Sequence, residues 1–122
     1  MPSSAVGVAP TYVRLVNEGR LAETVDLYAE DGEALPPNPA YEPVIRGRAA
    51  LREHYQRSVG RRLPKIEITH LYEAGDTRVV ELSSGTVDED QPWGVLDIFT
   101  VRADGLVTRM AAYRRPLARV RA

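Results

Sequence analysis

Asp97 is a carboxylate in an otherwise apolar strand pattern, and this position suggests acid–base chemistry. Between Trp93 and Arg102 one face carries Trp93, Val95, Asp97, Phe99 and Val101, and the other carries Leu96, Ile98 and Thr100. Because both faces are largely apolar, we expect both to be covered, with Asp97 pointing into an enclosed space of low dielectric. Burial raises the pKa of a carboxyl group, and a protonated Asp97 would donate a hydrogen bond. The alternatives are a partly exposed Asp97, or one paired with Arg109 or Arg114 on the neighbouring strand.

Three tyrosines supply the other candidate groups. Tyr12, Tyr28 and Tyr55 each lie on the apolar face of a predicted helix, so we expect three phenols to meet in one interior. A buried hydroxyl needs a hydrogen-bond partner, and converging hydroxyls can satisfy one another as a network. The simpler alternative is three ordinary core residues whose hydroxyls reach the surface.

The composition restricts any catalysis to carboxylates, phenols and imidazoles. The chain has no cysteine and two histidines, so we expect no metal site, and the absence of a phosphate-binding loop leads us to expect no cofactor. A formal net charge of -1 provides no basic field to attract nucleic acid or an anionic membrane. With no signal peptide and no apolar run of membrane length, the sequence predicts a cytoplasmic protein.

The elements that must position these groups are predicted to be helices first and strands afterwards. Apolar spacing predicts a first helix from Pro10 to Gly19, a second from Leu21 to a turn at Asp31–Gly32, and a third from Gly47 to Gly60. A loop with four prolines, Leu35 to Pro43, excludes both helix and central strand there.

Four strands are predicted after the third helix, over residues 65–73, 77–84, 93–102 and 106–114. Because this half shows no strand–helix–strand alternation, we expect these strands to form an antiparallel meander and not a parallel sheet. The 122 residues therefore suggest one α+β domain, 1–122, in which three helices pack on a curved, mostly antiparallel sheet. The end segments 1–8 and 116–122 are expected to be flexible.

The order and spacing of four segments resemble the ketosteroid-isomerase-like, or SnoaL-like, branch of the nuclear-transport-factor-like superfamily. The segments are Tyr12 to Gly19, Leu27 to Asp31, Gly47 to Tyr55, and Asp97 to Tyr113. This resemblance spans almost the whole chain and implies a cone-shaped fold that encloses a pocket. It also implies an oxyanion hole, a pair of donors for a negatively charged oxygen, formed by Tyr12 and a protonated Asp97 and supported by Tyr28 and Tyr55.

The catalytic base that the resemblance implies is missing at its usual position. Counting on from Tyr28 without a gap, the family's catalytic Asp corresponds to Pro36, which cannot accept a proton. The loop looks longer here, so Glu42, which precedes a proline, is our first candidate for the base, although it can also be a plain loop carboxylate. Weaker candidates are Glu33, Glu81 and His70, the last of which is expected to share a strand face with Ile66 and Ile68.

Seven residues are predicted to contact a substrate: His70, Trp93, Val95, Phe99, Met110, Ala112 and Arg114. Arg114 stands where the resemblance implies a large aromatic side chain. It would bind an anionic group of the substrate, pair with Asp97 and keep it ionised, or lie exposed at a strand end.

Three functions follow from the sequence. The first is a cofactor-free isomerase or lyase that moves a proton next to a carbonyl in a hydrophobic, steroid-like or polyketide-like molecule. The second is a cyclase or epoxide-opening catalyst of secondary metabolism, with Asp97 or Glu67 as acid or base. The third, favoured by Pro36, is a non-catalytic domain that binds a ligand or dimerises. In each case a sheet apolar on both faces needs a cover, so we expect a homodimer packed across the outer face.

Overall fold

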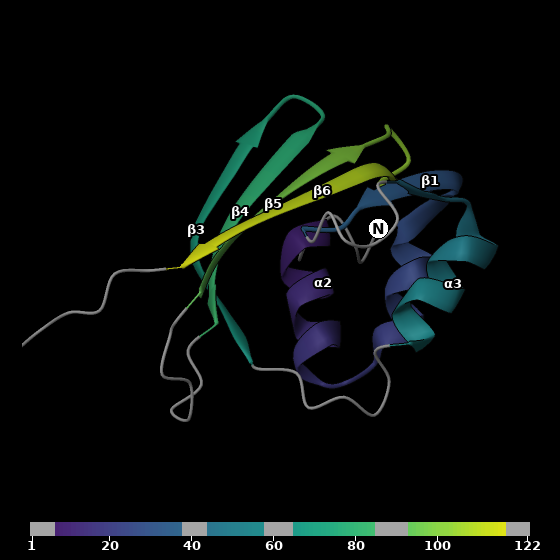
Figure 1. The fold of residues 1–122 in the computed structure, drawn as a ribbon. Coiled ribbons are helices and arrows are strands. Elements are labelled where there is room, and N and C mark those ends of the chain that lie inside the picture. The colour runs from purple at the N-terminus through teal and green to yellow at the C-terminus, as the bar shows by residue number, and fades with distance from the viewer. Residues whose placement is uncertain (1–6, 38–43, 58–64, 85–92, 117–122) are drawn as a thin grey trace, which may run out of the picture.

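The helices of this protein pack against one face of a curved sheet (Figure 1). A computed structural model describes residues 7–37, 44–57, 65–84 and 93–116. In chain order its elements are α2 (Val8–Asn17), the 3-10 helix η1 (Leu21–Leu27), β1 (Tyr28–Leu35), β2 (Ile45–Arg46), α3 (Arg48–Gln56), β3 (Ile66–Ala74), β4 (Thr77–Ser84), β5 (Trp93–Val101) and β6 (Val107–Pro116). The predicted α+β class is therefore confirmed.

Helix α2 begins two residues before the predicted start at Pro10. Its first residue, Val8, falls in the segment expected to be flexible, yet it is only 8% exposed and belongs to the core. Pro10 lies in the first helical turn, where its missing N–H leaves no hydrogen bond unmade. Gly19 follows the helix with a φ of 74°, a left-handed conformation that glycine adopts at little cost.

The predicted second helix is wrong beyond Leu27. Residues Leu21–Leu27 form a 3-10 helix, and Tyr28–Leu35 form strand β1 instead of a continued helix. Gly32, interpreted from the sequence as a helix stop, lies where β1 meets β6 closely, because a Cβ there would be 2.9 Å from the carbonyl oxygen of Val107. Pairing with the sheet thus overrides the helical spacing of the apolar residues.

The six strands form one sheet in the order β2-β1-β6-β5-β4-β3. Strand β1 runs parallel to β6, whereas every other neighbouring pair is antiparallel. The sheet is therefore mostly antiparallel, and its four later strands form a meander, as predicted. The parallel pair β1–β6 was not predicted, because β1 was not recognised as a strand.

The four later strands agree closely with the sequence prediction. Strand β4 has the predicted bounds, and β3, β5 and β6 differ from theirs by at most two residues at either end. Of the predicted third helix, the structure describes Arg48–Gln56, and residues 58–64 lie outside the described part. These strands could be predicted because their apolar and polar residues alternate and short turns separate them.

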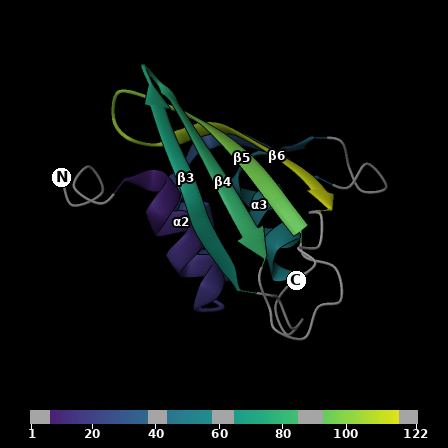
Figure 2. The same ribbon diagram turned by 90° about the vertical axis from the view of Figure 1, so that its left-hand side faces the viewer.

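The two faces of the sheet have different surroundings. The inner face carries α2, η1 and α3, and the core lies between; its most buried large side chains, each under 2% exposed, are Val25, Tyr28, Leu51, Val80, Phe99 and Val107. The outer face, turned toward the viewer in Figure 2, has none of the described helices in front of it. Among the described helices, none has the length and hydropathy needed to span a membrane.

Candidate functional site

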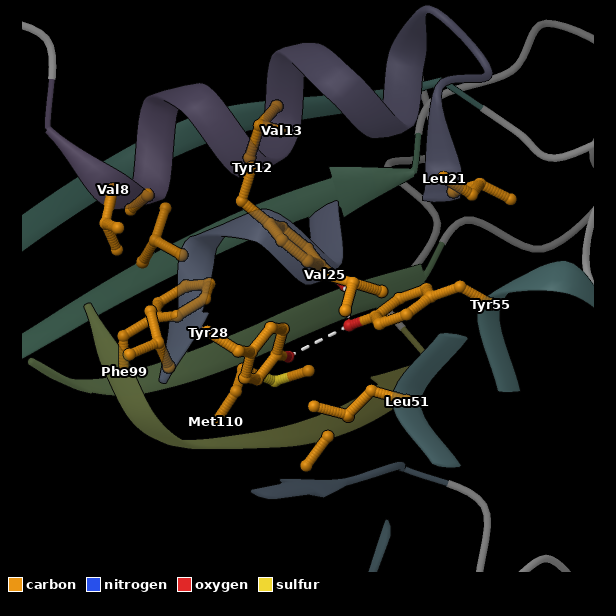
Figure 3. Packing of buried hydrophobic residues seen from close by; sticks show 14 of the residues in the cluster. Val8, Tyr12, Val13, Leu21, Val25, Tyr28, Leu51, Tyr55, Phe99 and Met110 are labelled. Atoms are coloured by element: carbon orange, nitrogen blue, oxygen red, sulfur yellow. Dashed lines mark hydrogen bonds between the residues drawn. The ribbon is translucent and has the colours of Figure 1, made fainter. Parts of the chain in front are cut away.

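Three tyrosines from three elements meet through their hydroxyl groups inside the fold (Figure 3). The hydroxyl of Tyr55, on α3, lies 2.9 Å from that of Tyr28 and 3.2 Å from that of Tyr12, on α2. All three side chains are buried, with exposures of 0 to 8%. The predicted network is therefore present, although Tyr28 reaches it from the first residue of β1 and not from a helix.

The residues around Tyr28 and Tyr55 are held by polar contacts that the sequence analysis missed. Arg48 donates from Nε (3.1 Å) and Nη2 (2.7 Å) to the carbonyl oxygen of Tyr28, which ties the start of α3 to the start of β1. Thr24, 0% exposed, donates its hydroxyl to the carbonyl of Leu21 at 2.6 Å and lies beside Tyr55. No motif marks either residue, because their partners are backbone atoms or belong to other elements.

Asn17 fixes α2 on the inner face of the sheet. Its side-chain amide donates to the carbonyl oxygen of Ile66, and its Oδ1 accepts from the N–H of Ile66, both at 2.8 Å. The last residue of α2 is thus bound to the first residue of β3, and this contact sets the position from which Tyr12 projects.

Asp97 points from β5 into the same interior. It lies in one row with Val80 and Ala112, and it is 4% exposed. Two residues along β5, the ring of Phe99 packs edge-on against Tyr12 with 5.4 Å between centroids. Desolvation by burial raises the pKa of Asp97 to about 7, so the carboxyl group is largely protonated below neutral pH.

The proposed pairing of Asp97 with Arg109 is wrong. Arg109 lies opposite Thr100, whose side chain is on the outer face, whereas Asp97 is on the inner face. The Nε atom of Arg109 is 3.8 Å from Glu33 on that outer face. Arg114 lies opposite Val95 in the strand register, but its side chain is outside what the structure describes.

The three phenols stay protonated over the whole physiological pH range. Burial is the main reason that the pKa of Tyr12 lies well above its ordinary value, followed by the repulsion that Tyr55, Tyr28 and Asp97 exert when they are ionised. The pKa of Tyr28 is raised by burial first, and then by Tyr55 and Asp97. Burial also raises the pKa of Tyr55, partly opposed by its hydrogen bonds to Tyr12 and Tyr28. The effect of Asp97 on all three phenols shows that they share one electrostatic environment.

A hydroxyl group has one proton, and this fixes the direction of the network whenever Tyr12 donates to a ligand. Tyr12 must then accept from Tyr55, and Tyr55 must accept from Tyr28. Each bond in such a chain polarises the next, so the Tyr12 proton becomes a better donor. The arrangement is suited to holding a negatively charged oxygen.

The other predicted contact residues divide into three groups. Val95, Phe99, Met110 and Ala112 share the inner face with Asp97; Phe99 is 0% and Met110 5% exposed, and the other two are half-buried. Glu42 lies outside the described residues, as do the side chains of Trp93 and Arg114. The third group is His70 alone, which lies on the outer face and not on the predicted inner face.

His70 does not face the interior with Ile66 and Ile68. The pairing shifts by one residue between Ile68 and His70, so His70 lies opposite Glu81 on the outer face. There its side chain is 62% exposed, and its Nδ1 lies 2.9 Å from Glu81 Oε2. A bulge of one residue cannot be read from an alternating pattern, which explains the error.

The remaining carboxylate candidates also lie on the outer face. Glu33 bonds to Arg46 at 2.9 Å, Glu81 contacts His70, and Glu67 is exposed opposite Ser83. Among the described residues, the buried polar side chains are Thr24 and Asp97, so Asp97 is the one buried carboxylate there. Within the same part of the chain, no three histidine or acidic side chains come together in a way that could hold a metal ion.

Comparison with known proteins agrees with this architecture. The model of the SnoaL-like domain family matches residues 10–110. A solved protein from Kribbella flavida DSM 17836, described as a ketosteroid isomerase, is 22% identical with a TM-score of 0.68 over 94% of this chain and 80% of its own. An NTF-2-like protein of unknown function from Burkholderia xenovorans LB400 is 19% identical with a TM-score of 0.71 over 93% and 84%.

A third similar structure is the epoxide hydrolase/cyclase-like enzyme SalBIII, which has a role in pyran ring formation in the polyether salinomycin. It is 23% identical with a TM-score of 0.64, covering 88% of each chain. No curated protein matches the sequence significantly. At these identities, the three structures establish a shared fold.

Proposed function

The chain belongs to the SnoaL-like domain family, and from this premise we propose that it is a cofactor-free isomerase or lyase that transfers a proton next to a carbonyl group. Its substrate is a hydrophobic small molecule of a steroid-like or polyketide-like kind. The observation that carries the proposal is Asp97, 4% exposed and with its pKa raised to about 7 by desolvation, in the same interior as the Tyr28–Tyr55–Tyr12 chain.

In the proposed reaction, the carbonyl oxygen of the substrate accepts hydrogen bonds from Tyr12 and from protonated Asp97. Removal of the neighbouring proton gives an enolate, whose negative charge gathers on this oxygen. The two donors therefore bind the transition state more strongly than the substrate, which is the condition for catalysis. Each donor of this kind contributes about 10²–10³ in rate.

The proposed base is Glu42. It takes the proton from the carbon next to the carbonyl, and in an isomerase it returns the same proton to a second carbon of the enolate system. Two facts support this choice. Pro36, directly after β1, has no group that accepts a proton, and Glu33, Glu67 and Glu81 are on the outer face.

A hydrophobic substrate fits the side chains around the two donors. Among the described side chains of the inner face near Asp97, Val95, Phe99, Met110 and Ala112 are apolar, and the side chain of Arg114, opposite Val95, lies outside the described part. Such a surface gains little from a charged molecule but stabilises an apolar one by removing its surface from water. A neutral substrate also leaves the carboxyl of Asp97 protonated.

Turnover of a 5-ene-3-ketosteroid, followed by the absorbance of the conjugated product, tests the proposal. Tyr12→Phe and Asp97→Asn should each lower kcat strongly, and Glu42→Gln should abolish detectable proton transfer. Glu81→Gln, a matched change of a carboxylate on the outer face, should leave kcat unchanged. Full activity in the Tyr12 and Asp97 variants would refute the mechanism.

A second candidate function is ring closure or epoxide opening, with Asp97 as the acid that protonates the leaving oxygen or as the base that activates a hydroxyl. It is favoured because Asp97 is the buried carboxylate of the described interior and its pKa of about 7 permits either role. The two functions differ in Asp97→Asn, whose amide still donates a hydrogen bond but cannot transfer a proton. The isomerase should keep part of its activity in this variant, and the cyclase should lose all of it.

Binding of a phenol that mimics the enolate separates both enzymes from a non-catalytic ligand-binding domain. An equilenin-like phenol should bind tightly to the wild type and weakly to Tyr12→Phe, because only an intact pair of donors stabilises the phenolate. Tight binding with no turnover of any ketosteroid or epoxide would favour the binding domain.

A further inference from the structure

Thr24 is a buried polar residue that the proposed reaction leaves without a role. It is 0% exposed, and among the described residues the other buried polar side chain is that of Asp97. It lies on η1, which contacts both α2, the helix of Tyr12, and α3, the helix of Tyr55. Its hydroxyl donates to the carbonyl oxygen of Leu21 at 2.6 Å. A buried hydroxyl costs free energy unless it is hydrogen-bonded, so the partners of Thr24 indicate what it does.

The hydroxyl of Thr24 also interacts with that of Tyr55. Burial raises the pKa of Tyr55, and hydrogen bonding with three side chains opposes it: Tyr12, Tyr28 and Thr24. Two of these neighbours, Tyr28 and Tyr12, have their hydroxyl oxygens 2.9 and 3.2 Å from that of Tyr55. A hydroxyl group has one proton and can accept two hydrogen bonds. Tyr55 can therefore bond to all three neighbours only by donating to one of them and accepting from the other two.

The bond to Leu21 decides what Thr24 offers to Tyr55. Because it uses the one proton of Thr24, toward Tyr55 this hydroxyl acts as an acceptor. A complete chain of donors then exists without any ligand: Tyr12 donates to Tyr55, and Tyr55 donates to Thr24. Tyr28 donates to Tyr55 as well, so each of the four hydroxyl protons has an acceptor. This order fits the finding that no buried side-chain oxygen or nitrogen atom of the described residues lacks a partner.

A ligand oxygen reverses one bond of this chain. Tyr12 can donate to the ligand only when its own oxygen accepts from Tyr55, because the Tyr12 proton is then no longer directed inward. Tyr55 must turn its proton from Thr24 to Tyr12. Binding thus gives up one neutral hydrogen bond inside the protein.

We propose that Thr24 is a positioning residue that accepts the Tyr55 proton in the ligand-free protein and competes with Tyr12 for it. This inference rests on the proposed function, in which Tyr12 donates to the substrate oxygen. Thr24 keeps the buried hydroxyls satisfied between turnovers, and in exchange it weakens the binding of any ligand oxygen. Because substrate and transition state both require the same reversal, Thr24 affects the two equally.

Two substitutions separate the hydroxyl of Thr24 from its packing. Thr24→Val nearly keeps the volume and removes the hydroxyl, whereas Thr24→Ser keeps the hydroxyl and removes a methyl group. In a fluorescence titration with an equilenin-like phenol, Thr24→Val should bind about three- to tenfold more tightly than the wild type, and Thr24→Ser should bind like the wild type. A role in packing alone predicts that serine, which leaves a cavity, weakens binding and that valine does not change it. Binding by Thr24→Val that is no tighter than that of the wild type would overturn the proposal.

Turnover of the 5-ene-3-ketosteroid gives a second measurement. The gain in Thr24→Val should appear as a lower KM and not as a higher kcat, because the substitution affects the ground state and the transition state alike. Circular dichroism should show that both variants are folded. If the valine variant does not fold, Thr24→Cys takes its place, because a thiol is a weak acceptor and should also tighten binding.

A third measurement needs neither ligand nor turnover. In ligand-free protein with tyrosine labelled with carbon-13 at Cζ, the Tyr55 signal should move in Thr24→Val and stay in place in Thr24→Ser. A Tyr55 signal that is the same in the wild type and in Thr24→Val would overturn the role of Thr24. A wild type that neither binds the phenol nor converts the ketosteroid would instead refute the proposed function, and the Tyr55 signal would still decide whether Thr24 accepts its proton.

Discussion

The two faces of the sheet place carboxylates in opposite environments. On the inner face Asp97 is 4% exposed and its pKa is raised to about 7 by desolvation. On the outer face Glu33 and Glu81 contact Arg46 and His70, and their side chains keep 24% and 45% of their exposure. Desolvation of this kind gives a carboxyl group that can donate or transfer a proton near neutral pH. An exposed carboxylate beside Arg46 or His70 is instead suited to contacts with positively charged groups.

The tyrosines follow the same division. Tyr12, Tyr28 and Tyr55 are buried inside and bond to one another. Tyr72, on the outer face, is half exposed and stacks on His70 with 6.1 Å between centroids. The hydroxyl groups of the inner phenols are held by hydrogen bonds to one another, whereas the ring of Tyr72 lies half exposed beside His70. From this comparison we predict that substitutions of the same kind affect stability and turnover more on the inner face than on the outer face.

The largest expected difference is in the pH dependence of stability. The folded pKa of Asp97, about 7, lies above the ordinary Asp value, so the folded chain holds this proton more tightly than the unfolded chain. The free energy of unfolding should therefore fall as the pH rises from about 4 to about 7, by about 4 kcal/mol from this group. Urea unfolding across this range should show that fall in the wild type but not in Asp97→Asn. A pH dependence that Asp97→Asn leaves intact would remove desolvation of Asp97 as the cause.

The next largest difference is in turnover by tyrosine variants. Tyr12→Phe removes a donor to the substrate oxygen and should lower kcat by about 10²–10³. Tyr55→Phe removes a donor to Tyr12 only, so the loss should be smaller, about tenfold, in line with one neutral hydrogen bond. Tyr72→Phe should leave kcat unchanged. Equal losses for Tyr12→Phe and Tyr55→Phe would mean that Tyr12 does not touch the substrate.

The inner half of this comparison could be predicted from the sequence to a large extent. Alternation placed Asp97 between apolar neighbours, and the helical spacing of Tyr12 and Tyr55 placed their rings in the core. These are local signals, because a residue's own neighbours determine which face it takes. The meeting of three phenols in one interior followed from the same reasoning, whereas the central place of Tyr55 between Tyr12 and Tyr28 did not.

What could not be predicted depends on contacts between distant segments. Helical spacing placed Tyr28 in a helix, but pairing of β1 with β6 draws it into a strand. A single bulge in β3 turns His70 outward, and Arg48 binds a carbonyl group twenty residues away. A strand partner, a register shift and a backbone acceptor leave no periodic trace in the chain, so the base side of the site is less determined than the acid side.

A smaller effect is expected from the glycine that brings β1 against β6. In Gly32→Ala the new Cβ would lie 2.9 Å from the carbonyl oxygen of Val107 and 3.2 Å from the ring of Tyr28. The strand must shift, and we expect a loss of about 1–3 kcal/mol in the free energy of unfolding, measured in urea. Gly75→Ala, in the β3–β4 turn, meets no atom within 4 Å, so only its left-handed φ of 58° should cost about 1 kcal/mol. A larger loss at Gly75 than at Gly32 would contradict the close approach of β1 and β6.

The smallest effect should come from an outer carboxylate. Glu33→Gln removes contacts with Arg46 at 2.9 Å and Arg109 at 3.8 Å, but the Arg46 side chain is 71% exposed and water screens the pair. The free energy of unfolding should change by less than about 1 kcal/mol, and added salt should reduce the change further. A loss of about 4 kcal/mol, as large as the pH effect predicted for Asp97, would mean that exposure does not separate the carboxylates of the two faces.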